Sequence, residues 1–330
     1  MTFVTRLAAA AVAAALLASP VAAKEVRFAK QLQVNNLPSM LVEHEKLFEK
    51  HAAALGEPDL TASWLTFANG GAAVDAMISG NVEFVSVGLT NFGVIWARTG
   101  GKVKGVAGVG GVALPLLTRN PDVKTLDDFK SSDRIAVPTV KVSNQAVMLS
   151  MALDKLHGPK ARNRLDEQTV QLGHSDALQA LLNPQHEVNT HFSTPPYSII
   201  AMKDWRVHKV MDTNDLFPEP LNSNVMFSTA AYHDANPVAV QAIIAALNEA
   251  NEMIANDPER AADLYLQISG DKLDKQDVVA LLKDRGTIFS TKPQGTLQVV
   301  QYMADTGLIP KRPQSYADMF FPEILAAQTN

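Results

Sequence analysis

A strand–helix–strand pattern that occurs twice constrains the fold of this chain more than any other feature. In the first copy, residues 61–67 are rich in β-branched and aromatic side chains, residues 72–78 place apolar side chains at helical spacing, and residues 82–87 alternate as a second strand. In such βαβ units, ligands bind beyond the carboxyl ends of the strands, where the first turn of a helix leaves backbone N–H groups unpaired. The pattern predicts an α/β fold with a candidate site at one sheet edge.

The second copy lies 104 residues further along the chain. Residues 66–90 align with residues 170–194 without a gap, so that the loop at 69–71 corresponds to the loop at 173–175. The identity between the copies is low, and a chance similarity of two βαβ units is the simpler alternative. We interpret the repeat as two similar α/β lobes that present the same edge, which predicts a cleft between them.

The first 23 residues have the pattern of a secretory signal peptide. Arg6 supplies a positive charge, residues 7–17 form a short Ala/Leu-rich stretch, and residues 21–23 are small as at a cleavage site, so a mature chain starting at Lys24 is expected in the periplasm. No later stretch approaches the roughly 18 apolar residues of a membrane span, and a retained anchor is the alternative. The chain has no cysteine, which excludes a lipidated N-terminal cysteine, thiolate catalysis and zinc–cysteine sites.

The charge balance is mildly acidic. The chain has 29 basic and 34 acidic residues, and loss of Arg6 with the signal peptide leaves 28 basic residues and a net charge of −6. No run of basic residues stands out. We therefore expect no nucleic-acid partner. The 330 residues, 47% of them hydrophobic, suffice for two lobes of ordinary size.

The order of the expected elements divides the chain. Further strands are expected at residues 25–31, 103–111, 134–137, 207–211 and 222–227. The prediction is two Rossmann-like lobes joined by a two-stranded hinge, with residues 24–114 and 226–330 in lobe one and residues 115–225 in lobe two. Hinge closure around a ligand is a common use of such an arrangement.

Helical patterns dominate the remainder of lobe one. A single helix is expected from Pro38 to about residue 55. Beyond residue 237, helices are expected at 238–256, 258–268, 275–284 and 296–305, followed by a C-terminal segment at 315–327. Because no strand is expected between them, we expect these extra C-terminal helices to cover the outside of lobe one.

No catalytic motif is recognisable. The chain lacks a nucleophile elbow, a zinc-protease motif and a P-loop, and the glycines from Gly105 to Gly111 favour a strand with close backbone packing. We interpret His44 and His51 as residues of a solvated helix face, and His174 as a surface histidine that alternatively lines the cleft. We expect no catalytic residue, no metal and no cofactor.

Polar and flexible residues at equivalent loop positions indicate binding. Asn69, Gly70 and Gly71 expose a helix start in lobe one, and we expect the same of Ser143 and Asn144 in lobe two. A helix start favours an anion by about 0.3–1 kcal/mol when exposed, and hydrogen bonds to a charged ligand add roughly 1.5–3 kcal/mol apiece. Four or five such contacts support micromolar affinity, about −8 kcal/mol. The alternative for each loop is an ordinary cap and turn.

Four segments, taken in order, resemble the periplasmic substrate-binding proteins of the nitrate, sulfonate and taurine ABC importers: NLPSMLVEHEKLFEKHAAALG, FANGGAAVDAMISGNVEFVSVG, LLTRNPDVKTLDDFKSSDRIAVP and EVNTHFSTPPYSII. The resemblance covers nearly all of residues 24–330. It implies a type II periplasmic binding protein that delivers a small solute to an ABC permease and its ATPase at the inner membrane. We expect the protein to be a monomer.

The resemblance also implies ligand contacts after the first strand, at the second helix start, after the third strand and at the lobe-two counterparts. In this chain the ligand-binding candidates are Gln33, Asn35, Asn36, Asn69, Gly70, Gly71, Gly88, Thr90, Asn91, Lys141, Ser143, Asn144, Ser193, Thr194 and Tyr197. Lys141 is their only cation, so an anion depends on backbone N–H groups, amides and hydroxyls. An organic solute with one acidic group suits this set better than nitrate does.

One aromatic ring is expected beside the cleft. Tyr197 is that candidate, with Trp64 or Trp96 as possible companions, and Tyr197 is equally well a core residue.

Two other functions stay open. The scaffold is similar to that of thiamine-pyrimidine synthases, but those enzymes use cysteine- and histidine-dependent iron chemistry, and this chain has no cysteine. A periplasmic sensor module that presents its closed form to a receptor is also compatible with the residues.

Overall fold

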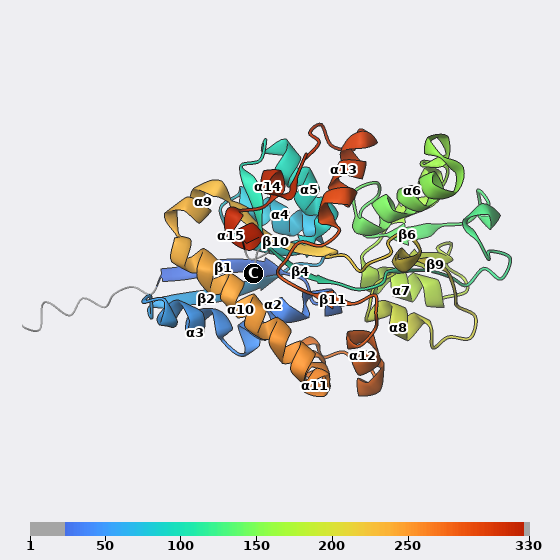
Figure 1. Cartoon of the computed structure of the whole chain (residues 1–330). Coiled ribbons are helices and arrows are strands. Elements are labelled where there is room, and N and C mark those ends of the chain that lie inside the picture. The colour runs from blue at the N-terminus through green and yellow to red at the C-terminus, as the bar shows by residue number, and fades with distance from the viewer. Residues whose placement is uncertain (1–23, 327–330) are drawn as a thin grey trace, which may run out of the picture.

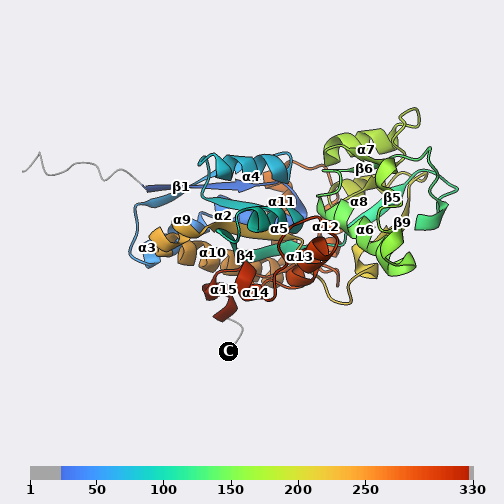
Figure 2. The ribbon, with the colours of Figure 1, turned by 90° about the horizontal axis from the view of Figure 1, so that it is seen from above.

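Two β-sheets with helices packed around them form two lobes that lie next to each other (Figures 1 and 2). The structure, a computed structural model, describes residues 24–326, so the signal peptide predicted at residues 1–23 lies outside the described residues. The first sheet contains, from edge to edge, β11 (Ile288–Phe289), β4 (Val103–Gly111), β10 (Asn224–Thr229), β3 (Phe84–Gly88), β1 (Lys24–Lys30) and β2 (Leu60–Thr66). The second contains β7 (Thr169–Gln171), β6 (Ile135–Val137), β8 (Thr190–Phe192), β5 (Pro115–Thr118) and β9 (His208–Asp212).

The predicted repeat is present in both sheets. In the first sheet β1 pairs in parallel with β2 and β3, and in the second β6 pairs in parallel with β7 and β8. The helix of the first unit is α4 (Gly70–Ile78), and adding 104 to both its bounds gives those of α7 (His174–Leu182). The expected α/β class with two Rossmann-like lobes is confirmed.

The remaining helices lie around these sheets (Figure 1). They are α2 (Leu37–His44), α3 (Leu47–Ala54), α5 (Leu89–Arg98), α6 (Asn144–His157), α8 (Tyr197–Ala201), α9 (Ala230–Ala235), α10 (Pro237–Asn256), α11 (Pro258–Ser269), α12 (Lys275–Leu282), α13 (Thr296–Asp305), α14 (Tyr316–Met319) and α15 (Pro322–Ala326), with a short 3-10 helix, η1 (Val34–Asn36).

The single helix expected at residues 38–55 is wrong. The structure has α2 and α3 in its place, separated at Glu45 and Lys46. Lys46 has a φ of 53°, in the left-handed region, which ends the run of helical hydrogen bonds and turns the chain before α3 begins.

Two chain crossings join the lobes, as the predicted hinge requires. One runs from β4 to β5 and the other from β9 to β10. They are hydrogen bonded to each other, because Leu114 N donates to Thr213 Oγ1 at 3.0 Å and Thr213 N donates to the Leu114 carbonyl at 3.2 Å. The hinge is therefore a paired element rather than two independent linkers.

The C-terminal helices do more than cover lobe one. The long helix α10 packs on α2 and α3, as expected. However, Asp277 of α12 pairs with Lys203 beside α8 at 2.8 Å, and Tyr302 Oη of α13 lies 3.0 Å from Ser150 Oγ of α6. In addition, β11 lies between α12 and α13. The expectation that no strand lies between these helices is wrong. They cover lobe one as expected, and α12 and α13 also contact lobe two.

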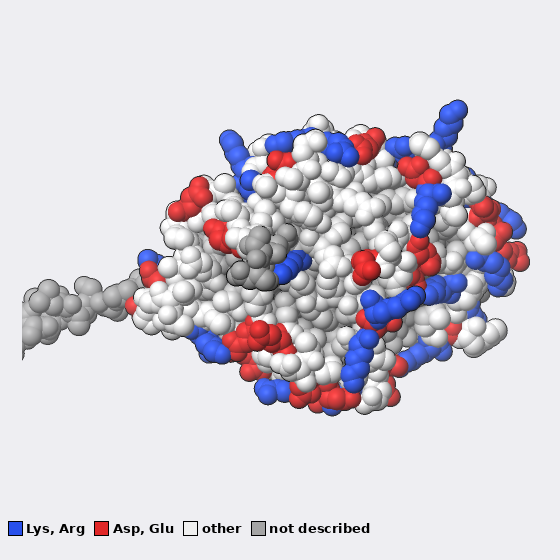
Figure 3. All heavy atoms as spheres, viewed as in Figure 1, with Lys and Arg blue, Asp and Glu red and all other residues white. Residues whose placement is uncertain are grey.

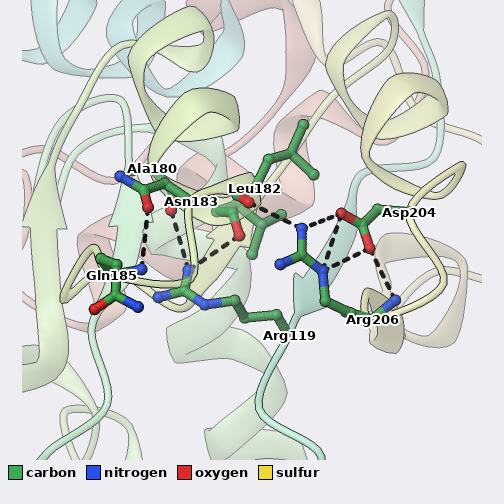
Figure 4. A network of polar contacts seen from close by, with 8 residues as sticks. Arg119, Ala180, Leu182, Asn183, Gln185, Asp204 and Arg206 are labelled. Atoms are coloured by element: carbon green, nitrogen blue, oxygen red, sulfur yellow. Dashed lines mark hydrogen bonds and ion pairs between the residues drawn. The ribbon is translucent and has the colours of Figure 1, made fainter.

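Charged side chains hold the carboxyl end of α7, around Ala180 and Leu182 (Figure 4). Arg119 Nη1 donates to the carbonyls of Ala180 and Leu181, both at 3.0 Å, and Arg206 Nη2 donates to the Leu182 carbonyl at 3.0 Å. Arg206 is itself paired with Asp204. Cations at the carboxyl end of a helix are favourable, so this network anchors α7 and fixes the position of its first residues.

The surface carries both signs of charge. On the face shown in Figure 3, Lys and Arg side chains lie next to Asp and Glu side chains along the rim, and the middle is mostly uncharged. Some charges of opposite sign are paired directly, such as Lys50 Nζ with Glu249 Oε1 at 2.6 Å. Such a surface does not present a broad field of one sign.

Candidate ligand-binding cleft

A pocket lies between the lobes, at the carboxyl ends of the parallel strands. It is narrow: about 40 Å³ is open to the centre of a water-sized sphere, which is room for a few water molecules. Nine of the residues predicted from the sequence line it: Gln33, Asn35, Asn69, Gly70, Gly88, Asn91, Ser143, Asn144 and Thr194. They come from both lobes, so the structure brings the two sets of loops together.

Four helix starts meet at this pocket. Asn69 caps α4 by accepting a hydrogen bond from Ala72 N at 3.0 Å, and Ser143 caps α6 by accepting one from Ala146 N at 3.4 Å. Gly88 precedes α5, and His174 is the first residue of α7. Because each helix start carries unpaired N–H groups and the positive end of a dipole, the pocket favours a ligand with a negative group.

Asn144 connects the lobes across the pocket. Its Oδ1 accepts hydrogen bonds from Thr90 N at 3.1 Å and Thr90 Oγ1 at 3.0 Å, and its Nδ2 donates to the Ser223 carbonyl at 2.8 Å. A residue of lobe two therefore caps the start of α5 in lobe one. Any separation of the lobes would break this contact, so we call the arrangement that keeps it closed.

Replacing Asn144 by alanine is expected to destabilise the closed arrangement by about 2 kcal/mol, because it removes these hydrogen bonds and leaves Thr90 N–H without its partner. Small-angle X-ray scattering should then give a larger radius of gyration than for the unchanged protein. Asn183→Ala, an exposed change in the same lobe, is the control and should not alter it. An unchanged radius in both variants would show that Asn144 does not hold the lobes together.

A pair of buried histidines forms part of the lobe-two wall. His174 Nδ1 lies 2.9 Å from His191 Nε2, and His174 Nε2 lies 3.3 Å from Gln145 Nε2. Burial lowers the pKa of His174 to about 4, and burial together with the neighbouring His174 holds the pKa of His191 well below its usual value. Both imidazoles are therefore neutral at neutral pH. The interpretation of His174 as a surface residue is wrong, since it is 8% exposed and lines the pocket.

The pocket wall contains no charged side chain. Among its lining residues, none is Lys, Arg, Asp or Glu, and eight carry a carboxamide: Gln31, Gln33, Asn35, Asn69, Asn91, Asn144, Gln145 and Asn224. Lys141, the one cation among the predicted residues, lies on a different pocket that is also lined by Arg162 and Tyr302. Recognition in the cleft thus depends on amides, hydroxyls and helix starts.

The other predicted residues do not line the pocket. Asn36 is fully buried and accepts a hydrogen bond from Ser86 Oγ at 2.8 Å, and Thr90 is held by Asn144. Ser193 is fully buried, and Gly71 follows the pocket residue Gly70 in α4. The set outside the pocket is therefore Asn36, Gly71, Thr90, Lys141, Ser193 and Tyr197.

The aromatic candidates belong to the cores. Tyr197 packs against a cluster that contains Leu117 and stacks on His174 with the ring centroids 5.6 Å apart. Trp96 is fully buried, and Trp64 stacks on Phe28 with the centroids 4.4 Å apart. None of the three lines the pocket.

Sequence reasoning missed six lining residues: Gln31, Ala68, Leu114, Pro138, Gln145 and Asn224. Thr139 begins the loop 139–144 at which the resemblance implies contacts, and His174 was placed at the cleft only as an alternative. For His174 a usable signal existed, because it is the repeat counterpart of Gly70.

Within residues 24–326, no cluster of His, Cys, Asp and Glu is suited to hold a metal ion, and no helix in that range is long and apolar enough to cross a membrane.

Two α/β lobes, two paired crossings and a cleft at the strand ends define the periplasmic binding protein fold, and solved structures agree. The alkanesulfonate-binding protein SsuA of Xanthomonas axonopodis pv. citri, bound to MOPS, has a TM-score of 0.70 and 19% identity, over 89% of this chain and 97% of that one. The periplasmic nitrate-binding protein NrtA of Synechocystis has a TM-score of 0.67 and 12% identity, over 93% and 89%.

A Candida albicans protein described as having the generic periplasmic binding protein fold has a TM-score of 0.68 and 13% identity, over 89% and 94%. No protein-family model matches the chain, and no curated protein sequence matches it. The resemblance expected from the sequence is therefore confirmed at the level of the fold.

Proposed function

We propose that the protein is the solute-binding component of an ABC importer. It captures a small organic solute with one anionic group, of the sulfonate, taurine or nitrate-like class, in the interlobe cleft by closure of the hinge, and it delivers the solute to a permease and its ATPase. In this proposal lobe one comprises residues 24–114 and 226–330, and lobe two comprises residues 115–225. The protein is a periplasmic monomer without catalytic activity.

The meeting of four helix starts in a cleft without charged side chains carries the proposal. Helix starts supply N–H groups and dipoles that favour an anion without a side-chain cation. The pocket also lacks a nucleophile paired with a base, because its histidine has both ring nitrogens close to other side chains. Binding without chemistry is what this wall supports.

The solved neighbours support the ligand class. One is described as binding an alkanesulfonate and one as binding nitrate, and both ligands are oxyanions. The closed contact made by Asn144 supports capture by hinge motion, because the same side chain touches both lobes at the pocket. We propose Gln33, Asn35, Asn69, Gly70, Gly88, Asn91, Ser143, Asn144 and Thr194 as the binding residues.

Isothermal titration of the purified protein tests the proposal against alkanesulfonates, taurine, nitrate and aromatic carboxylates. We expect one class to bind with micromolar affinity. Asn69→Ala should then weaken binding about 5-fold or more, because it uncaps α4 at the pocket. Asn81→Ala, an exposed change beyond the other end of α4, serves as the control and should bind as the unchanged protein does. Absence of heat with every class would show that the ligand class is wrong.

The two alternatives make different predictions. An enzyme on this scaffold would return the bound solute altered, whereas mass spectrometry after incubation should show it unchanged. A sensor module would stimulate a receptor rather than the ATPase activity of a permease complex in liposomes. We expect the stimulation of a permease.

A further inference from the structure

Two carboxamides at the pocket are hydrogen bonded to each other on one side only. Asn35 lies in η1 and Asn224 is the first residue of β10, and they are 3% and 2% exposed. Asn35 Nδ2 donates to Asn224 Oδ1 at 3.1 Å and to Ser223 Oγ at 3.3 Å. The other ends of the pair, Asn35 Oδ1 and Asn224 Nδ2, are buried without a hydrogen-bond partner, and both residues line the pocket.

The free ends of this pair are one acceptor and one donor. Exchanging the oxygen and nitrogen positions in both side chains keeps the hydrogen bond between them and again leaves one acceptor and one donor. Buried polar atoms in native proteins almost always have a partner, so this pair is complete only when a bound group both donates and accepts. A pure oxyanion offers acceptors alone and satisfies half of the pair.

Lobe two also contributes a pocket residue with a buried polar atom that has no hydrogen-bond partner. Thr194 is a lining residue from lobe two, and its Oγ1 is also buried without a partner, as are Ser193 Oγ and His191 Nδ1 nearby in the chain. A threonine hydroxyl donates or accepts, so it adapts to whichever group the ligand presents. The discriminating contact is therefore the asparagine pair.

We propose that Asn35 and Asn224 are specificity-determining residues that select a solute with an N–H or O–H group beside an acceptor. This inference rests on the proposed function and narrows it: the solute is an amino- or hydroxy-substituted organic acid, rather than nitrate or an unsubstituted alkanesulfonate. A site that hydrogen bonds a substrate donor rejects the analogue without it strongly, because the protein acceptor is then buried unpaired.

Matched pairs of probes test the proposal by isothermal titration at pH 7. The pairs are taurine with ethanesulfonate, isethionate with ethanesulfonate, and β-alanine with propionate, in which the acid is kept and only the donor is lost. In at least one pair the donor-bearing member should bind about 10-fold tighter or more. In Asn35→Leu and Asn224→Leu this preference should disappear, whereas Asn81→Leu, at an exposed asparagine, should keep it.

The outcomes separate the inference from the function. Equal affinity within every binding pair would overturn the inference and leave the proposed function standing, as would a preference that survives in leucine variants with native circular dichroism. Binding of nitrate or an aromatic carboxylate with no binding by any of these probes would also overturn the inference alone, whereas no binding by these probes or by the wider panel would overturn the proposed ligand class and the inference with it. If a leucine variant does not fold, Asn224→Asp takes its place. The ratio of the two affinities within each probe pair, measured in the unchanged protein, is itself decisive.

Discussion

Replacing Gly111 by alanine is expected to lower the free energy of unfolding by about 3 kcal/mol or more. A Cβ at this position lies 1.7 Å from the Leu221 carbonyl oxygen and 2.9 Å from its carbon, so it meets backbone rather than a movable side chain. Overpacking commonly costs about 1–3 kcal/mol, and more when the backbone has to shift. Because Gly111 ends β4 and Leu221 precedes β10, the change forces apart the two crossings that join the lobes.

Urea unfolding followed by circular dichroism measures this effect as a lower transition midpoint. Gly173→Ala is the matched control: no atom lies within 4 Å of a Cβ there and its φ is −61°, so we expect no clash and only the cost of about 1 kcal/mol that alanine carries at the N-cap of a helix. Equal midpoints for Gly111→Ala and the unchanged protein would show that the crossings have room to separate.

The repeated unit could be predicted because its signals are local. Alternation of apolar residues and a glycine or asparagine at each turn are readable within a few residues. The helix predicted at 72–78 and the offset of 104 together gave the end of α7 at residue 182, whereas both helices begin two residues earlier than the pattern indicates. The glycines of β4 were also interpreted correctly as sites of close packing. A Cβ at Gly105 lies 2.3 Å from the Phe320 ring, and one at Gly110 lies 2.5 Å from the Asn35 carbonyl oxygen.

The contacts of the C-terminal helices could not be predicted. An amphipathic pattern shows which helix face is buried, but it does not show which lobe the other face meets. Tyr302 lies 152 residues from Ser150 in sequence, and only the folded arrangement brings them together. The break at Lys46 was missed for a different reason, since a left-handed lysine has no signal in helix propensity.

The repeat located only part of the site, because Gln33, Asn35, Ser143 and Asn144 were predicted from loops outside the two repeated stretches and also line the pocket. Thr194 is the counterpart of Thr90, and His174 is the counterpart of Gly70, so the offset alone marks His174 as a helix start at the cleft. It was set aside because an isolated histidine is usually a surface residue. Asn224 had no such signal, because it reaches the pocket only through the return crossing, which has no counterpart in the repeat.

Acid is expected to destabilise the protein between about pH 6.5 and pH 4. In the folded protein burial lowers the pKa of His174 to about 4, whereas an unfolded histidine titrates near 6.5. As the pH falls through this window the unfolded chain takes up the proton first, so the free energy of unfolding decreases with it. The loss from His174 reaches about 3 kcal/mol at pH 4, and His191 adds to it in the same direction because burial also lowers its pKa.

Urea unfolding at pH 7, 6, 5 and 4.5 measures this slope. The window is selective, because a carboxyl held by hydrogen bonds, such as Asp204 with a pKa of about 2, titrates below it. His174→Gln should lower the slope by up to about 1.4 kcal/mol per pH unit, while His44→Gln, at an exposed histidine, should leave it unchanged. Equal slopes in His174→Gln and the unchanged protein would mean that His174 titrates as it does in water, and the cleft would then gain a cation below neutral pH instead of recognising its solute with neutral groups alone.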